Sequence, residues 1–359
     1  MRKHLTIALA LIVVLALVMS GCAQTPAASP TAAPAPTKAA EPTKAPEPTK
    51  AAEPTKPAAA PTTAAAPTGV KKVGLVTDVG KVDDKSFNES AWNGVQKAAK
   101  EFGFQASYIE TQQPTDYDKN IAQFADEGFD VIVTVGFMLG DATKAAAAKY
   151  PNVKFIIVDS EYDPPIDNVA CLMFAEDQSG FLAGALAALM TKTNVIGGVY
   201  GKEIPPVIKF RKGYENGAAL VNPKVKVLGT YIDSFTDPVK GGEVAKSQMA
   251  ENADVIFGAG GKTGNGALIA AKQKGVYAIG VDTDQYYTLP EAKDVLISSA
   301  MKRVDVAVYT AIKSAVEGKF KGGTMLFTAA NDGVGLAPFH DLDSKVPAEV
   351  KAKLNEIAK

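Results

Sequence analysis

Short apolar runs alternate with longer amphipathic stretches along most of the chain from residue 70 onwards. Near-continuous apolar runs are typical of strands buried on both faces, and the stretches between them have the length of helices. The expected strands form two series, 72–77, 104–109, 130–135, 153–158 and 168–174, then 194–200, 225–232, 254–258, 276–281 and 294–299. The expected helices are 86–102, 116–127, 140–150, 176–192, 206–221, 239–252, 263–274 and 302–317. This alternation predicts an α/β fold of two lobes, each a parallel sheet flanked by helices.

The first residues follow a different pattern. Two basic residues precede an apolar run from Leu5 to Met19, and small residues then lead to Cys22. This order is typical of a secretory signal peptide, and the run is shorter than the about 20 residues of a membrane-spanning helix. The sequence MSGC at its end resembles a bacterial lipobox, in which the cysteine is acylated and becomes the new N-terminus. We therefore expect residues 1–21 to be removed and Cys22 to be lipidated, while an uncleaved anchor and an ordinary signal peptide remain alternatives.

Residues 23–69 contain 11 prolines and no Leu, Ile, Val, Met or aromatic residue. Such a segment cannot bury enough apolar area to offset the entropy of ordering it, so we expect residues 22–69 to be a disordered linker. A proline-rich chain extends by roughly 3.1 Å per residue, so this linker could reach on the order of 100 Å. Together with the lipid on Cys22, it would tether the folded part to the extracytoplasmic face of the cell membrane.

The remaining residues are numerous enough for two lobes. We assign 70–190 mainly to an N-terminal lobe and 191–300 mainly to a C-terminal lobe. Residues 301–359 are expected to form a crossover helix and a C-terminal segment that both lobes share. The net charge of −1 and the lack of a basic block argue against nucleic-acid binding. Cys171 is the only cysteine besides Cys22, so we expect no disulfide within the chain, and we expect a monomer.

Polar and glycine residues follow the expected strands in both series. Because ligands of parallel α/β sheets bind beyond the carboxyl ends of the strands, these positions are the candidate site. They are Asp78, Gly136, Phe137 and Asp159 in the first series, and Gly260, Gly261, Asp282 and Lys302 in the second. Equivalent placement in both series favours a cleft between two lobes over a single catalytic pocket.

The patterns that suggest catalysis are weak. S-x-x-K at Ser299–Lys302 and K-T-G at Lys262–Gly264 stand in the reverse of the order found in serine β-lactamases. Beyond the signal peptide His340 is the only histidine, which excludes zinc sites built from several histidines and cysteines. We therefore expect no enzymatic activity and no cofactor. A carboxylate-only site for a hard cation or for glycoside hydrolysis remains an alternative, and it would use Asp78, Asp83, Asp84 and Asp282.

The same positions suit a ligand that has a planar part and a hydroxyl-rich part. Phe87 and Phe257 offer apolar ring faces, and Asn88 can donate and accept hydrogen bonds at a heteroaromatic edge. The carboxylates of Asp78 and Asp282 can accept from hydroxyl or amide donors, and the Lys302 ammonium can donate to ligand oxygens. A nucleoside fits this description.

Some residues near the start of the expected helix 86–102 have structural interpretations. Ser86 is suited to the N-cap position, with Glu89 at the partner position of a capping box. Trp92 lies further along the same helix and is expected in the core.

TDVGKVDDKSFNESAWNG, residues 77–94, resembles the opening signature of the basic membrane protein family. Further matching blocks follow in the same order, namely GFMLGDA, FIIVDS, AEDQSGFLAG, IPPVIKFRKGYENGAALVNP, AGGKTGNG, IGVDTDQ and MKRVDVAVYTAIK. The resemblance runs from about Val73 to Ala337. It implies a two-lobed periplasmic-binding-protein fold of type I, in a lipoprotein that binds a purine nucleoside unchanged and delivers it to the permease of an ABC importer.

The resemblance also implies roles for individual residues. The base would stack on Phe87 and Phe257, near Asp78 and Asn88. The ribose would lie near a second set, Asp282, Lys302, Gly260 and Gly261. One departure from the family pattern is the lysine in AGGKTG, Lys262, where relatives often have AGGTG.

Two other functions remain open at this point. A receptor of the same fold could bind a sugar, an autoinducer or another small molecule, and such a site would not need the amide edge of Asn88. An anchored hydrolase is the second alternative, against which the scarcity of histidine argues.

Overall fold

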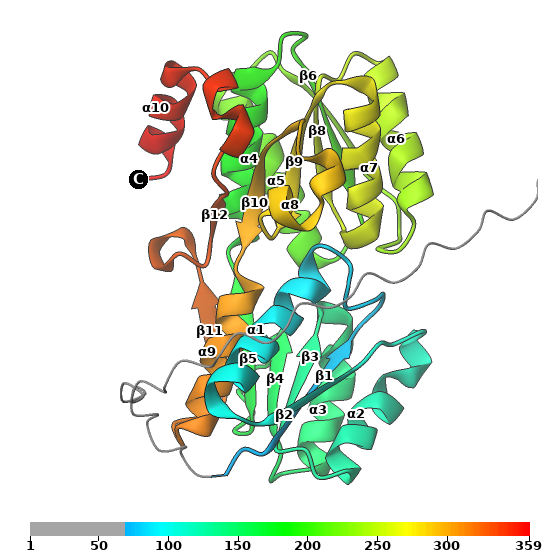
Figure 1. Ribbon diagram of the computed structural model, residues 1–359, viewed down its shortest axis with the longest axis vertical. Coiled ribbons are helices and arrows are strands. Elements are labelled where there is room, and N and C mark those ends of the chain that lie inside the picture. Colours follow the sequence, from blue (N-terminus) through cyan, green and yellow to red (C-terminus); the bar gives the residue numbers. More distant parts are fainter. Residues whose placement is uncertain (1–68) are drawn as a thin grey trace, which may run out of the picture. The chain divides into compact units, whose positions relative to one another are not determined.

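Two six-stranded sheets organise residues 69–359, the part of the chain that the computed structural model describes (Figure 1). The first sheet is parallel throughout, in the spatial order β11 (Gly323–Phe327), β5 (Val169–Phe174), β4 (Lys154–Val158), β3 (Val131–Val135), β1 (Lys72–Thr77) and β2 (Gln105–Ile109). The second has the order β12 (Val334–Leu336), β10 (Leu296–Lys302), β9 (Tyr277–Asp282), β8 (Val255–Ala259), β6 (Val195–Tyr200) and β7 (Lys226–Tyr231), and β12 alone runs antiparallel. The two-lobed α/β fold is confirmed.

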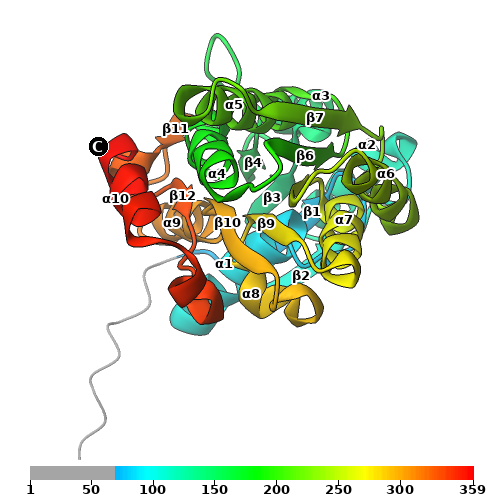
Figure 2. The ribbon, with the colours of Figure 1, turned by 90° about the horizontal axis from the view of Figure 1, so that it is seen from above.

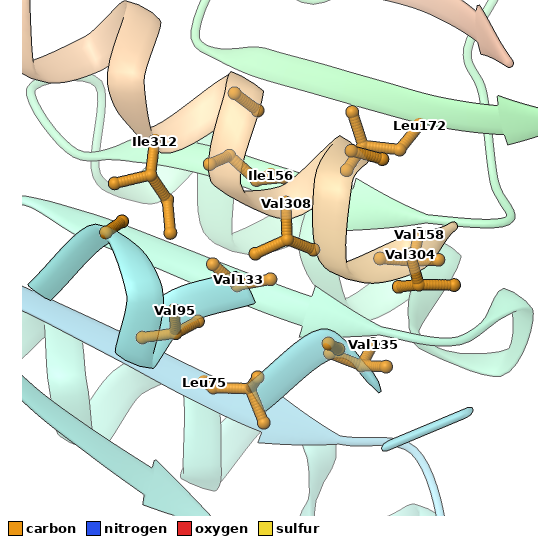
Figure 3. Close-up of a cluster of buried hydrophobic side chains, with 14 of the residues drawn as sticks. Leu75, Val95, Val133, Val135, Ile156, Val158, Leu172, Val304, Val308 and Ile312 are labelled. Atoms are coloured by element: carbon orange, nitrogen blue, oxygen red, sulfur yellow. The ribbon is translucent and has the colours of Figure 1, made fainter. Parts of the chain in front are cut away.

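Helices cover both faces of the first sheet. One face carries α1 (Phe87–Phe102) and α9 (Val304–Val316), and the other carries α2 (Tyr117–Asp126) and α3 (Gly140–Lys149). In Figure 3, three apolar residues of α9, Val304, Val308 and Ile312, lie at a spacing of four and face sheet residues such as Ile156 and Val133. This spacing puts all three on one side of the helix, which explains why the segment is helical and which face it buries.

The second sheet is covered in the same way. One face carries α4 (Glu176–Met190), α5 (Pro205–Val221) and α10 (Ala348–Ile357), and the other carries α6 (Pro238–Ala250) and α7 (Gly261–Lys274). The short α8 (Gln285–Thr288) follows β9. The remaining helical turns are 3₁₀ helices at Pro114–Asp116, Phe137–Leu139, Pro290–Ala292, Ala329–Asn331 and His340–Lys345.

Helices α4 and α5 lie side by side (Figure 2), and their backbones are too close to leave room for side chains between them at several glycines. A Cβ added to Gly184 of α4 would lie 1.9 Å from the carbonyl oxygen of Tyr214, and one added to Gly217 of α5 would lie 1.9 Å from that of Phe181. Only glycine allows backbones to approach so closely. These two glycines therefore fix the distance between the helices.

The described chain passes between the lobes at three places, β5 to α4, β10 to α9 and β11 to β12. The expected lobe boundary at residue 190 is wrong for α4, because its apolar residues pack in the core of the second sheet. Within residues 301–359, α9 and β11 belong to the first lobe, whereas β12 and α10 belong to the second.

Every expected strand and helix is present, with ends that differ by at most three residues. The strands β11 and β12 and the helices α8 and α10 were not expected. Strand β11 alternates between partly buried and exposed residues at the edge of its sheet, so it lacks the continuous apolar run of the inner strands. Cys171 is buried in β5, as expected.

No helix among residues 69–359 is long and apolar enough to cross a membrane. The expected signal peptide, Cys22 and the linker as far as residue 68 lie outside the described residues.

Candidate ligand-binding site

A cavity that opens to solvent lies where residues of both lobes meet at the carboxyl ends of the strands. Its lining comprises Asp78, Val79, Asp84, Phe87, Asn88, Gly136, Phe137, Asp159, Ile204, Pro206, Val207, Phe210, Phe235, Ala259, Gly260, Gly261, Val281, Asp282 and Lys302. Ten of the residues expected from the sequence are in this set. The exception is Phe257.

Phe257 does not line the cavity, so its expected contact with a ligand is wrong. Its side chain is fully buried in the core of the second lobe, where it stacks on Tyr214 with ring centroids 5.0 Å apart. The reason is its position inside β8, where alternate side chains point to opposite faces of the sheet. Phe257 points toward α4 and α5, and the loop that follows the strand forms the cavity instead.

The second lobe contributes an apolar wall that was not expected from the sequence. Ile204, Pro206, Val207 and Phe210 come from the start of α5 and the residue before it, and Phe235 comes from the loop between β7 and α6. Both segments follow strands of the second sheet. The rule that ligands bind beyond strand ends could therefore have found them.

Asp84 caps helix α1 and so positions Phe87 and Asn88. Its Oδ1 accepts from the backbone N–H groups of Ser86 and Glu89 at 2.9 and 3.1 Å, and its Oδ2 accepts from that of Asn88 at 3.0 Å. These are donors that a helix start leaves without partners. Ser86 does occupy the N-cap position, but its side chain makes no capping bond, so the expected capping box of Ser86 and Glu89 is wrong.

The Ser86 hydroxyl instead donates to Asp282 Oδ2 in the other lobe at 2.6 Å. Asp282 is buried, and its backbone has φ 65°. Burial raises the pKa of the Asp282 carboxyl, whereas the charge of Lys302 and the hydrogen bond from the Ser86 hydroxyl lower it.

Trp92 is partly buried, packs on the core of the first lobe and makes an edge contact with Tyr108. It has the structural role expected from the sequence.

Asp78 ends β1 and lies against the backbone of the next strand end. Its N–H donates to the Val135 carbonyl at 3.0 Å, and its Oδ1 accepts from the Val79 N–H at 2.6 Å. Gly136 has φ 124°, and a Cβ there would lie 2.0 Å from Asp78 Oδ2. Any larger residue at 136 would displace the carboxylate. Burial raises the pKa of Asp78 to about 7, although the Val79 N–H partly lowers it.

Asn88 supplies an acceptor without a partner. Its Nδ2 donates to the Val79 carbonyl at 3.0 Å, whereas its Oδ1 is buried and has no hydrogen-bond partner among the described residues. A buried polar atom without a partner is costly, so Oδ1 is available to a donor on a ligand.

The cavity has more carboxylates than cations. Asp78, Asp84, Asp159 and Asp282 line it, and Lys302 is the one cation among its described lining residues. Burial raises the pKa of Asp84 to about 7 as well, against the lowering effect of three backbone N–H groups. The site is therefore rich in acceptors, and it disfavours an anionic ligand.

The second lobe also holds the turn that precedes α1. Asn265 Nδ2 donates to the Asp84 carbonyl at 2.8 Å, and Gln285 Nε2 and Thr288 Oγ1 donate to the Lys85 carbonyl at 3.0 and 2.9 Å. We call these three residues the interlobe clasp. Closer to solvent, Lys262 Nζ lies 3.2 Å from Asp83 Oδ1. The unusual lysine of the glycine loop thus pairs with the other lobe and does not line the cavity.

Two helix-covered sheets with a cavity at their strand ends are the architecture of a two-lobed solute-binding protein. The family model described as "ABC transporter substrate-binding protein PnrA-like" matches residues 71–359, and the chain belongs to this Bmp family. The resemblance to the basic membrane protein family is thereby confirmed. The protein is the substrate-binding component of an ABC transporter, which implies a ligand and a permease. Because such components bind without catalysing a reaction, the family also supports the expectation that the chain is not an enzyme.

Similar proteins occur in several organisms. The nucleoside-binding protein BmpA of an ABC transporter in Lactococcus lactis is 34% identical over 305 residues, which cover 80% of this chain and 87% of that protein. Basic membrane protein A of Borreliella burgdorferi is 37% identical over 270 residues, which cover 74% of this chain and 78% of that protein. An ABC transporter solute-binding protein from Aeropyrum pernix has a similar crystal structure, with a TM-score of 0.71 and 30% identity, over 80% of this chain and 85% of that one.

Proposed function

We propose that the protein binds a nucleoside, most favourably a purine nucleoside, between its lobes and delivers it to the permease. The observation that carries this proposal is the orphaned Asn88 Oδ1 at a cavity that also contains aromatic rings from both lobes. A purine has N–H or NH₂ donors on its edge and π faces above and below. A purine in this cavity could therefore donate to Asn88 Oδ1 and stack on the aromatic rings.

The two rings proposed to hold the base are Phe87 from the first lobe and Phe235 from the second. Phe235 takes the place that the sequence analysis gave to Phe257. Stacking of a base on an aromatic side chain contributes about 1–3 kcal/mol. The ribose hydroxyls would then donate to carboxylates such as Asp282 and accept from Lys302. The other lining residues expected from the sequence are also proposed to contact the ligand, namely Asp78, Gly136, Phe137, Asp159, Gly260 and Gly261.

The charge of the cavity supports a nucleoside over a nucleotide. A phosphate would enter a space lined by four carboxylates and one ammonium, all of them buried. Like charges repel strongly where water is excluded. The Lactococcus lactis relative is named a nucleoside-binding protein, which agrees with this assignment.

Isothermal titration with inosine, guanosine, adenosine, pyrimidine nucleosides, free bases, ribose and nucleoside monophosphates tests the proposal. We expect stoichiometric, tight binding of purine nucleosides, with much weaker binding of the base or ribose alone. Binding of free sugars alone would overturn it and favour the sugar receptor, whose hydroxyls the same carboxylates could accept. Tight binding of the monophosphates would contradict the charge argument.

We also propose that the mature protein is anchored by acyl chains, such as palmitate, on Cys22. The sequence MSGC and the following proline-rich segment support this, and a relative in Pyrococcus abyssi, 35% identical over 286 residues, is named a lipoprotein. Metabolic labelling with radioactive palmitate should mark the wild-type protein in the membrane fraction. The Cys22→Ser variant should be unlabelled and should leave that fraction. Label retained by the variant would contradict the proposal.

A further inference from the structure

Lys302 lines the cavity, but carboxylates on two other elements hold its ammonium. The side chain is 1% exposed, and its Nζ lies 2.6 Å from the Asp159 carboxylate, which follows β4. It also lies 2.9 Å from Glu176 Oε1, at the first residue of α4. The rings of Phe87 and Phe174 lie 5.0 and 4.9 Å from Nζ. The ammonium is thus surrounded on several sides by fixed groups.

Glu176 is the unusual member of this group. It is 1% exposed, and it does not line the cavity. Its Oε2 lies 3.3 Å from Nζ of Lys209 on α5, and Lys209 also donates to the Phe174 carbonyl at 3.2 Å. A buried carboxylate is costly unless it is paired and hydrogen-bonded, so its retention behind the ligand cavity calls for an explanation.

The number of donors on an ammonium supplies that explanation. A lysine ammonium has three N–H groups in a tetrahedral arrangement. Asp159 accepts one of them at 2.6 Å, and Glu176 forms an ion pair with the ammonium at 2.9 Å. Together the two carboxylates fix the position of the ammonium. Lys302 lines the cavity, so a remaining N–H can be given to a ligand. A flexible lysine would lose up to about 2 kcal/mol of rotamer entropy when it bound a ligand, whereas one that is already fixed loses little.

We propose that Glu176 is a positioning residue that holds the Lys302 ammonium in the orientation in which it donates to the ligand. This inference rests on the proposed function only in that the ligand is taken to be a nucleoside. Glu176 does not touch the ligand, and it acts through Lys302. It stands directly after the β5–α4 crossing, and Lys302 stands directly before the β10–α9 crossing, so the pair also joins two of the segments that connect the lobes.

The test compares inosine binding by wild type, Glu176→Gln, Lys302→Met and the double variant. Glu176→Gln keeps the shape and removes the charge, and we expect it and Lys302→Met each to weaken binding about tenfold, the loss of one charge-assisted hydrogen bond. The double variant should bind no more weakly than Lys302→Met alone. The matched control is Asp177→Asn, an exposed acid in the same turn of α4, for which we expect unchanged affinity.

A second readout follows the ammonium directly. In ¹⁵N-labelled protein, the buried Lys302 ammonium should give a slowly exchanging NMR signal, assigned by its absence in Lys302→Met. Glu176→Gln should shift or broaden this signal, and Asp177→Asn should leave it unchanged. If Glu176→Gln does not fold, Glu176→Asp keeps the charge but shortens the side chain, and it should show the same losses.

Two results would overturn the proposal. One is unchanged affinity and an unchanged Lys302 signal in Glu176→Gln. The other is additive loss in the double variant, which would mean that Glu176 acts independently of Lys302. If the wild type binds no nucleoside, the proposed function fails instead, and the NMR signal still decides whether Glu176 orders the ammonium.

Discussion

The first lobe presents three carboxylates and an amide to the cavity, Asp78, Asp84, Asp159 and Asn88, whereas the second lobe presents mainly apolar side chains. The polar groups stand at strand ends, in the turn before α1 or in the first turn of α1, and backbone hydrogen bonds or neighbouring side chains hold them. The apolar groups come from the first turns of α5 and the loop that contains Phe235. We call these the polar wall and the apolar wall.

The difference between the walls has a consequence for how a ligand would be held. Hydrogen bonds to the polar wall are directional, so we expect this wall to set the orientation of the ligand. Burial of ligand surface against the apolar wall has no preferred direction, so we expect it to add affinity without fixing the orientation.

The largest effect is expected behind the apolar wall, at Phe257. Phe257→Ala would leave a cavity in the core of the second lobe, and it should lower the free energy of unfolding by about 3–5 kcal/mol. Denaturant titration of the ligand-free protein measures this loss. Ligand affinity of the protein that remains folded should change little.

Phe235→Ala is the matched comparison, because it removes the same side chain from the apolar wall itself. It should weaken inosine binding by about 1–3 kcal/mol, with a small effect on stability. If Phe257→Ala weakened inosine binding more than Phe235→Ala, the assignment of Phe235 as the ligand-contacting ring of the second lobe would be wrong.

The polar wall is tested by Asp78→Ala. Removing a carboxylate that accepts from the ligand should weaken inosine binding roughly 10- to 100-fold, the cost of about 1.5–3 kcal/mol for a hydrogen bond to a charged group. Isothermal titration measures it. Asp118→Ala, which removes an exposed acid on α2, is the control and should bind as the wild type does. Equal affinities of both variants would remove Asp78 from the site.

The polar wall should also make the stability of the ligand-free protein depend on pH. The pKa values of Asp78 and Asp84 are raised from 3.8 to about 7, so folding favours their protonated forms. Their contribution to stability is complete below about pH 4 and is lost as the pH rises through 7. Between pH 5 and 7 each group that titrates alone can lower the free energy of unfolding by up to about 1.4 kcal/mol per pH unit.

Denaturant titration at pH 5, 6, 7 and 8 measures this slope. Asp78→Asn keeps the shape of the side chain and should make the slope shallower. A wild-type stability that rises between pH 5 and 7, or a slope that Asp78→Asn leaves intact, would contradict the assignment.

The smallest effect is expected at the solvent-exposed pair of Lys262 and Asp83, outside both walls. Exposed ion pairs contribute about 0.2–1 kcal/mol, so Lys262→Ala should weaken ligand binding by no more than about fivefold. The effect should diminish in 0.5 M salt.

Asn265→Ala removes a buried donor of the interlobe clasp, and it should weaken ligand binding more than Lys262→Ala does, without salt dependence. The reverse order would show that closure depends on surface charge.

The carboxylates at strand ends could be predicted from the sequence because strand ends are visible as the ends of apolar runs. Asp78, Asp159 and Asp282 each follow such a run directly, and parallel topology then brings them to one edge. Phe257 could not be placed in this way. Its position within the strand gives the alternation of faces, but the partner that covers each face depends on the packing of α4 and α5, which are distant in sequence.

Two further features depended on contacts that no local pattern records. Ser86 has the residue type and position of an N-cap, yet its hydroxyl bonds to Asp282, 196 positions later, and Asp84 does the capping. Glu176 lies at a helix start where an acidic residue is ordinary. Its pairing with Lys302 becomes visible only when the two crossings between the lobes are placed together.

The contact between α4 and α5 limits how the site can be altered. Helix α5 begins the apolar wall, and at Gly184 and Gly217 its backbone already touches α4. Neither helix can move toward the other without a collision of main chains. Room for a bulkier ligand would therefore have to come from smaller side chains in the apolar wall, for example at Phe210. A methyl group added at Gly184 would push the helices apart and misplace the wall, with no change to any residue that touches the cargo.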